Sequence, residues 1–111
     1  MDVPQQASLL RIFVGEDERS EGRPLYEAIV LKAREQHLAG ATVLRGPMGF
    51  GRSSHLHTAK ILRLSEDLPV VIEIVDSEEK IAAFLPVLDS LMTSGLVTLE
   101  KAQVIRYGQQ Q

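Results

Sequence analysis

The order of the regularly patterned segments restricts the fold of this 111-residue chain more than any other feature. Residues 9–14, 41–44 and 70–75 are short runs of β-branched and other apolar residues, which favour strands, and residues 97–107 form a fourth, mostly extended segment. Two segments with apolar residues at helical spacing follow the first and the third of these runs. The resulting order, β-α-β-β-α-β, predicts an α+β, ferredoxin-like sandwich: a four-stranded antiparallel sheet with two helices on one face.

The ends of the two helices carry sequence signals. Gly40 is placed to cap the C-terminus of the first helix. Asp76 and Ser77 are good N-cap residues for the second helix, and Gly95 is expected to close it. Pro86 falls inside the second helix and predicts a bend there.

The sheet is expected to be apolar on both faces. In residues 9–14 and 70–75, apolar side chains occupy both alternating sets of positions, and alternate positions of a strand point to opposite faces. Leaving the face without helices in water would be unfavourable by about 25 cal/mol per Å2, so we expect a second copy of the chain to cover it. The alternative is that the long loop after the second strand folds over this face.

Composition excludes several classes of function. The net charge of −3, from 12 basic and 15 acidic residues, argues against a nucleic-acid partner. The absence of cysteine excludes disulfides, zinc–thiolate sites and cysteine nucleophiles. No apolar run approaches the ~20 residues needed to span a bilayer, and no signal-peptide pattern is present. We therefore expect a cytoplasmic protein without membrane insertion.

The chain length fits one domain, which we place at residues 9–108. Residues 1–8 are expected to form an extended or disordered tail, and residues 109–111 a frayed one. Residues 16–23 are rich in charge and predict a solvated loop.

The candidate binding site lies in the loop after the second strand, residues 45–60. Gly46, Gly49 and Gly51 permit close approach of main-chain N–H groups, which can form an anion-binding nest. Arg45 and Arg52 flank the glycines and could pair with phosphate oxygens. The spacing matches neither a P-loop nor a dinucleotide fingerprint, so a surface turn with solvated arginines is the alternative.

Two of the three histidines suggest a metal site. His55 and His57 are two residues apart, so on a strand they would share a face. With a third ligand from elsewhere they could hold a divalent metal; otherwise both are exposed loop residues. His37 is expected at the end of the first helix, where a cation is favoured.

The chain resembles a known family in several segments. The element order, the long loop, the motif Gly49-Phe50-Gly51-Arg52 and residues 100–108 are similar to the PII signalling proteins. Residues 24–28, 39–46 and 48–51 resemble still more closely a family of uncharacterised PII-like proteins of bacteria and archaea. The resemblance covers nearly the whole chain.

This resemblance implies a homotrimer that binds an adenine nucleotide in clefts between subunits. It places Gly49, Gly51 and Arg52 in the cleft at the base of the loop, and Arg106 at the phosphates. With the neighbouring Arg45, Gly46 and Phe50, these residues form the predicted ligand site. The 45–60 loop is expected to change shape with the ligand and to contact an unidentified protein target. The resulting prediction is a regulatory module and not an enzyme.

Two departures from the PII pattern bear on the ligand. The glycine-rich phosphate loop of PII proteins is reduced here to residues 93–96, and Val104 stands where a second arginine is usual. Each lost charge-assisted hydrogen bond is worth about 1.5–3 kcal/mol. AMP or ADP is therefore expected in preference to magnesium-bound ATP, with no obligatory cofactor.

Two other functions remain open. A divalent-metal-binding trimer of the cation-tolerance type, which shares the fold, would use His55 and His57. A weak nucleotide hydrolase would need a residue to position water, and spacing assigns none, because catalytic sets of this kind are recognised by geometry.

Overall fold

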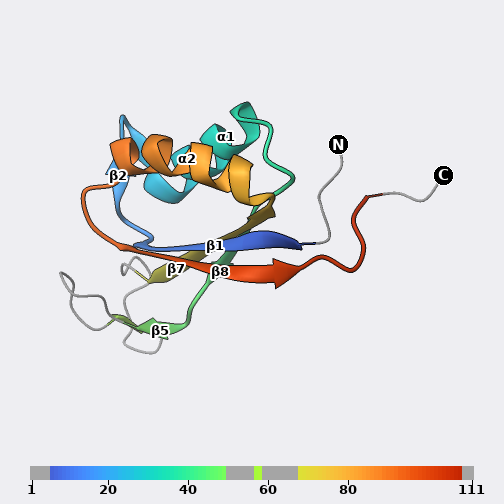
Figure 1. Ribbon diagram of the computed structural model, residues 1–111. Coiled ribbons are helices and arrows are strands. Elements are labelled where there is room, and N and C mark those ends of the chain that lie inside the picture. The colour runs from blue at the N-terminus through green and yellow to red at the C-terminus, as the bar shows by residue number, and fades with distance from the viewer. Residues whose placement is uncertain (1–5, 50–56, 59–67, 109–111) are drawn as a thin grey trace.

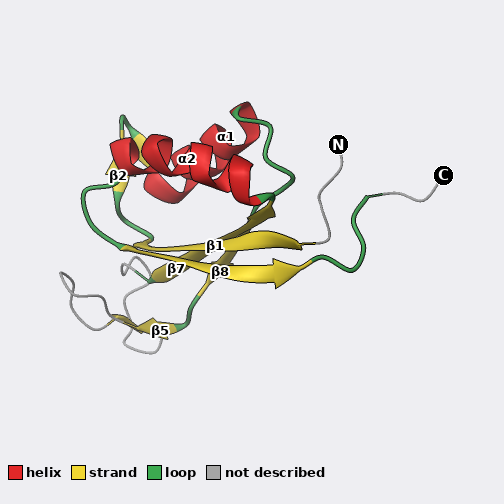
Figure 2. Ribbon diagram, in the orientation of Figure 1, coloured by secondary structure: helices red, strands yellow, loops and turns green. Residues whose placement is uncertain are grey.

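The computed structural model describes residues 6–49, 57–58 and 68–108. Its central element is a four-stranded antiparallel sheet in the order β4-β7-β1-β8. Both helices lie on one side of this sheet, as Figures 1 and 2 show. The strands are β1 (Gln6–Gly15), β4 (Thr42–Arg45), β7 (Pro69–Asp76) and β8 (Leu96–Gln103), and the helices are α1 (Leu25–Glu35) and α2 (Glu78–Leu91). The predicted fold class is confirmed.

Two short hairpins accompany the sheet. β2 (Arg19–Ser20) pairs with β3 (Arg23–Pro24), and β5 (Met48–Gly49) pairs with β6 (His57–Thr58). The prediction of a plain loop over residues 16–23 is wrong for its second half. There, Glu21 and Gly22 both have positive φ angles, 48° and 86°, and two such residues form the tight turn that matches the twist of a hairpin.

The core lies between the sheet and the two helices. Along β7, every second side chain is buried, beginning with Val70, and the intervening ones are half-buried. Ile29 of α1 and Phe84 of α2 are 0% and 1% exposed and complete the same cluster. Burying a large apolar side chain contributes roughly 1.5–3 kcal/mol, so this layer provides most of the driving force for folding.

The C-terminus of α1 differs from the prediction. Gly40 was expected to cap it, but the cap is a Schellman motif centred on His37, whose φ is 61°. The N–H of Leu38 donates to Ala33 O and that of His37 to Arg34 O, both at 3.0 Å. Leu38 is then buried in the core. The burial of Leu38 therefore sets the end of the helix, and Gly40 takes no part in the cap.

The second helix begins as predicted and ends earlier. Ser77 is its N-cap, and the side chain accepts a hydrogen bond from Lys80 N at 3.1 Å. Pro86 lies within the helix, where it removes one backbone hydrogen bond. The helix ends at Leu91, so Gly95 does not close it. Gly95 instead turns the chain into β8 with a φ of 115°.

Replacing Gly95 with alanine is expected to destabilise the fold by about 2–3 kcal/mol. A Cβ atom at this position would lie 2.7 Å from the backbone oxygen of Phe13 and 2.7 Å from Met92 Cε. Gly40→Ala is the matched control, because its φ is not positive and a Cβ there meets nothing within 4 Å. Urea unfolding at one protein concentration measures both, and equal stability of the two variants would contradict this reading.

The sheet face opposite the helices combines an apolar surface with a central charged group. Arg11 Nε donates to Glu73 Oε2 and Arg11 Nη1 to Glu100 Oε2, each at 2.9 Å. The hydrogen bond to Glu73 raises the pKa of Arg11 above its ordinary value, so this guanidinium stays charged. The strand register places six apolar side chains around it, those of Leu9, Phe13, Leu44, Val71, Val75 and Leu96. We call this surface the open face.

Candidate functional site

The predicted loop begins beside Pro69. Gly46 N donates to Pro69 O at 2.8 Å, directly after the end of β4. A Cβ atom at Gly46 or Gly49 would lie 2.9 or 3.0 Å from Cγ of the Pro69 ring. These two glycines therefore allow the start of the loop to pack against the start of β7. Glycine spacing alone suggested close approach to a ligand; within the described residues the close approach is to proline.

Arg45 lies at the centre of a polar cluster at this loop base. Its Nη2 atom is 2.7 Å from Glu16 Oε2 and donates to the Tyr26 hydroxyl at 3.3 Å. The guanidinium carbon also lies 6.0 Å from the centroid of the Tyr26 ring, within cation–π range. The Arg45 side chain is 56% exposed and that of Glu16 26%. An arginine so placed is open to solvent yet already paired.

Glu18 accepts hydrogen bonds from three further segments at the same end of the sheet. Its carboxylate accepts hydrogen bonds from Gly15 N at 2.8 Å and from Ser94 Oγ at 3.2 Å. Its backbone oxygen accepts from Leu25 N, the first residue of α1, at 2.7 Å. The short connection at residues 93–95 thus lies at the loop-base end of the molecule.

Arg106 lies at the opposite end of the sheet. Gln103 pairs with Gln6, whereas Pro69 pairs with Gly15 at the other end of the same strand. Nine residue steps along β1 amount to about 30 Å. Beyond β8, Tyr107 donates its hydroxyl to Ala39 O at 2.9 Å. Figure 1 shows this C-terminal segment and the β5 hairpin on opposite sides of the domain. One chain therefore does not bring Arg45 and Arg106 together.

Several predicted residues lie outside the part of the chain that the structure describes. Phe50, Gly51, Arg52 and His55 belong to this group. His57 is described only through its backbone, which pairs with Gly49 in the β5–β6 hairpin. Within residues 6–49, 57–58 and 68–108, no group of three histidine or acidic side chains is arranged to hold a metal ion.

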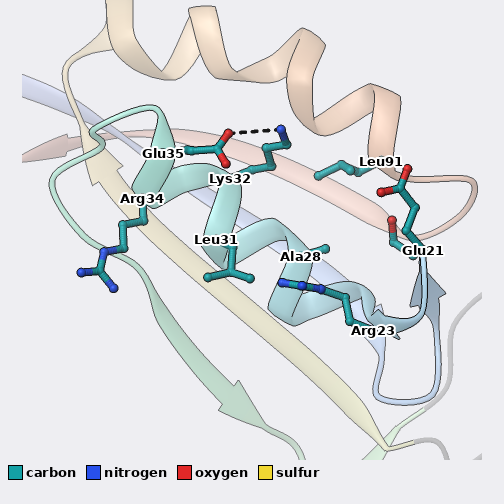
Figure 3. A pocket seen from close by; sticks show the side chains of 9 residues that line it. Glu21, Arg23, Ala28, Leu31, Lys32, Arg34, Glu35 and Leu91 are labelled. Carbon is teal, nitrogen blue, oxygen red and sulfur yellow. Dashed lines mark hydrogen bonds and ion pairs between the residues drawn. The ribbon is translucent and has the colours of Figure 1, made fainter.

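Two surface hollows are lined by residues other than Glu16, Tyr26 and Arg45. One, of about 580 Å3, is lined by the exposed side of α1 and the β2–β3 hairpin (Figure 3). It carries Arg23, Arg34 and Glu21, and its Lys32 is paired with Glu35 at 3.2 Å. Because its charges are of both signs, it does not select an anion. The other, of about 660 Å3, lies between α2 and the start of β8, and its lining contains no basic residue.

The fold is similar to that of solved PII-like proteins. The solved structure of CPII, a nitrogen regulatory PII-like protein from Thiomonas intermedia bound to ADP, AMP and bicarbonate, matches with a TM-score of 0.64 and 18% identity. The alignment covers 91% of this chain and 90% of that one. A second CPII structure, bound to ADP and bicarbonate, gives a TM-score of 0.62 at 19% identity.

The chain belongs to the DUF190 family, described as Uncharacterized ACR, COG1993, whose model matches residues 7–104. A UPF0166 protein of Aquifex aeolicus is 45% identical over 97 residues, which cover 87% of this chain and 91% of the relative. A UPF0166 protein of Methanocaldococcus jannaschii is 34% identical over 102 residues, covering 91% and 94%. The predicted family resemblance is confirmed. Neither helix in the described part of the chain has the length and apolar character of a membrane-spanning segment.

Sequence reasoning missed two members of the loop-base cluster. Glu16 was read as one of a run of solvated charges, and Tyr26 was not singled out as a candidate site residue. Neither has a sequence signal that links it to Arg45, since 19 residues separate Tyr26 from Arg45 along the chain. The pairing of β4 with β7 and the packing of α1 against the sheet bring the three side chains together.

Proposed function

We propose that this chain is a PII-like regulatory module that forms a homotrimer and binds an adenine nucleotide in clefts between its subunits. AMP and ADP are the preferred ligands, because the connection at residues 93–96 is short and Val104 offers no cation. The 45–60 loop responds to the ligand and presents a surface to a protein target. The protein acts by binding, without chemistry of its own.

One observation carries this proposal: Arg45 and Arg106 lie at opposite ends of one sheet, whose strand β1 is about 30 Å long. That is too far for one nucleotide to touch both within a single chain. A cleft between the loop base of one subunit and the C-terminal segment of the next would bring them to the same phosphates. The solved CPII structures support the ligand class, since those proteins of similar fold are described with ADP and AMP. The apolar open face supports the assembly.

Calorimetric titration of the purified protein with AMP, ADP and magnesium-bound ATP tests the ligand. AMP and ADP are expected to bind more tightly than magnesium-bound ATP, and Arg106→Ala to weaken binding at least about tenfold, since a charge-assisted bond is worth 1.5–3 kcal/mol. Arg34→Ala is the matched control, because it removes the same charge from the exposed side of α1. No binding of any adenine nucleotide at millimolar concentration would overturn the proposal.

Mixed assemblies test whether the cleft lies between subunits. Arg45→Ala and Arg106→Ala chains each give weak binding alone. Co-assembled in equal amounts, about a quarter of their clefts combine an intact loop base with an intact Arg106 from the neighbouring subunit. Recovery of that fraction of tight sites is the expected result. Its absence would show that both arginines act within one chain or that one of them does not bind.

A further inference from the structure

We propose that Glu16 sets the ligand affinity of the loop base by competing with a phosphate group for Arg45. In the free protein, the Glu16 carboxylate holds the guanidinium; a phosphate takes its place when the ligand binds. This inference rests on the function proposed above. It adds a residue that lowers the affinity for the ligand by holding Arg45 in the free protein.

The geometry of the guanidinium explains the competition. Arginine offers two edges for bidentate binding of an oxyanion, one with Nε and Nη2 and one with Nη1 and Nη2. Both edges use Nη2, and in this structure the Nη2 atom of Arg45 faces both Glu16 at 2.7 Å and Tyr26 at 3.3 Å. A phosphate therefore gains a bidentate contact only when Nη2 gives up one of these partners.

Charge identifies Glu16 as the partner that must move. The Glu16 carboxylate is 2.7 Å from Arg45 Nη2, so a phosphate bound to the same nitrogen would lie beside it, and two neighbouring anions repel each other. The Tyr26 hydroxyl is neutral, its bond is longer, and its ring can keep contact with the guanidinium through the cation–π interaction. Release of Glu16 therefore has two effects: it removes the repulsion, and it frees Arg45 Nη2 to donate to the phosphate.

Glu16 also connects the two ends of the segment between β4 and β7. Its side chain holds Arg45 at the first end, and its backbone N–H donates to Leu68 O at the other, at 2.8 Å. Gly46 is joined to Pro69 by the hydrogen bond described above. An exchange of partners at Arg45 therefore acts on the residues where this segment both leaves and re-enters the sheet.

Two substitutions at Glu16 separate this competition from a general effect of charge. Glu16→Gln removes the charge at nearly constant size. Glu16→Asp keeps the charge but is one methylene shorter, so it loses the 2.7 Å contact. We expect both to bind AMP or ADP about two- to fivefold more tightly than the parent, the range that a partly exposed ion pair supports. Glu79→Gln, an exposed acid at the start of α2, is expected to match the parent.

Tyr26 supplies a readout that does not need a nucleotide. The chain has two tyrosines and no tryptophan, so in a Tyr107→Phe background all tyrosine emission comes from Tyr26. Inorganic pyrophosphate is expected to change this emission at a two- to fivefold lower concentration in Glu16→Gln than with Glu16 intact.

The outcomes distinguish the two proposals. If the parent binds nucleotide and both Glu16 variants bind no more tightly, the competition is overturned and the proposed function stands. If no chain binds nucleotide, the proposed function is overturned. In that case the pyrophosphate titration decides: a response that Glu16→Gln shifts supports the competition, and an unchanged or absent response overturns it as well.

Discussion

An aspartate at Val71 or at Leu96 is expected to convert the proposed trimer into single folded chains. Both side chains lie on the open face, opposite Phe13 in the strand register. In the proposed trimer a neighbouring subunit would cover this face. Each new carboxylate would then be buried without a partner, which costs several kcal/mol per charge. In a single chain the same side chain stays in water, so the fold itself should be kept. Light scattering gives the mass, and circular dichroism checks the fold.

A matched control for this experiment lies on the same strand. Leu99 is 53% exposed and Leu96 56%, but Leu99 pairs with Leu10 and so points to the helix side of the sheet. Leu99→Asp is expected to keep the mass of the parent. If Leu96→Asp and Val71→Asp also keep that mass, another surface joins the subunits. A parent that is already a single chain would overturn the trimer.

Asp76→Ala is expected to cost about 3 kcal/mol in the free energy of unfolding, the largest stability loss among these variants. The Asp76 side chain is fully buried at the end of β7. Its two oxygens accept from Ala39 N at 2.8 Å and from Ser77 N at 2.6 Å. Alanine would leave two N–H groups without their acceptor, one before β4 and one at the start of α2. Urea unfolding at a fixed protein concentration measures the change.

Asp89→Ala provides the comparison, because Asp89 is exposed on α2. It is expected to change stability by less than about 0.5 kcal/mol. Asp76→Asn should fall between the two, since the amide keeps one acceptor oxygen but turns a donor toward an N–H group. A loss of under 1 kcal/mol in Asp76→Ala would mean that water replaces the carboxylate.

Local patterns were sufficient to predict the architecture. The residues 70–75 could be divided between the two faces of β7 from the sequence, because the period of a strand is two whatever its surroundings. Ser77 was recognisable as an N-cap, since that hydrogen bond closes within four residues. The order of such elements then leaves few topologies, and the one predicted is the one observed.

Local signals failed where a tertiary contact decided the outcome. Gly40 looked like the cap of α1, yet the burial of Leu38 ends the helix at His37. Asp76 was read as a second N-cap residue, whereas its carboxylate also holds Ala39, 37 residues away. In each case the competing interaction joins segments that are distant in sequence, and no window of neighbouring residues contains it.

Short-range periodicity and local motifs were enough to predict the fold class, the family and the glycine-rich loop with Arg45 at its start. The tertiary structure alone decided what Arg45 contacts and how far it lies from Arg106. The pairing of β4 with β7 and the packing of α1 against the sheet place Glu16 and Tyr26 beside Arg45, and the length of β1 separates Arg45 from Arg106. Both the neighbours of Arg45 and its separation from Arg106 depend on contacts between segments that are distant in the sequence.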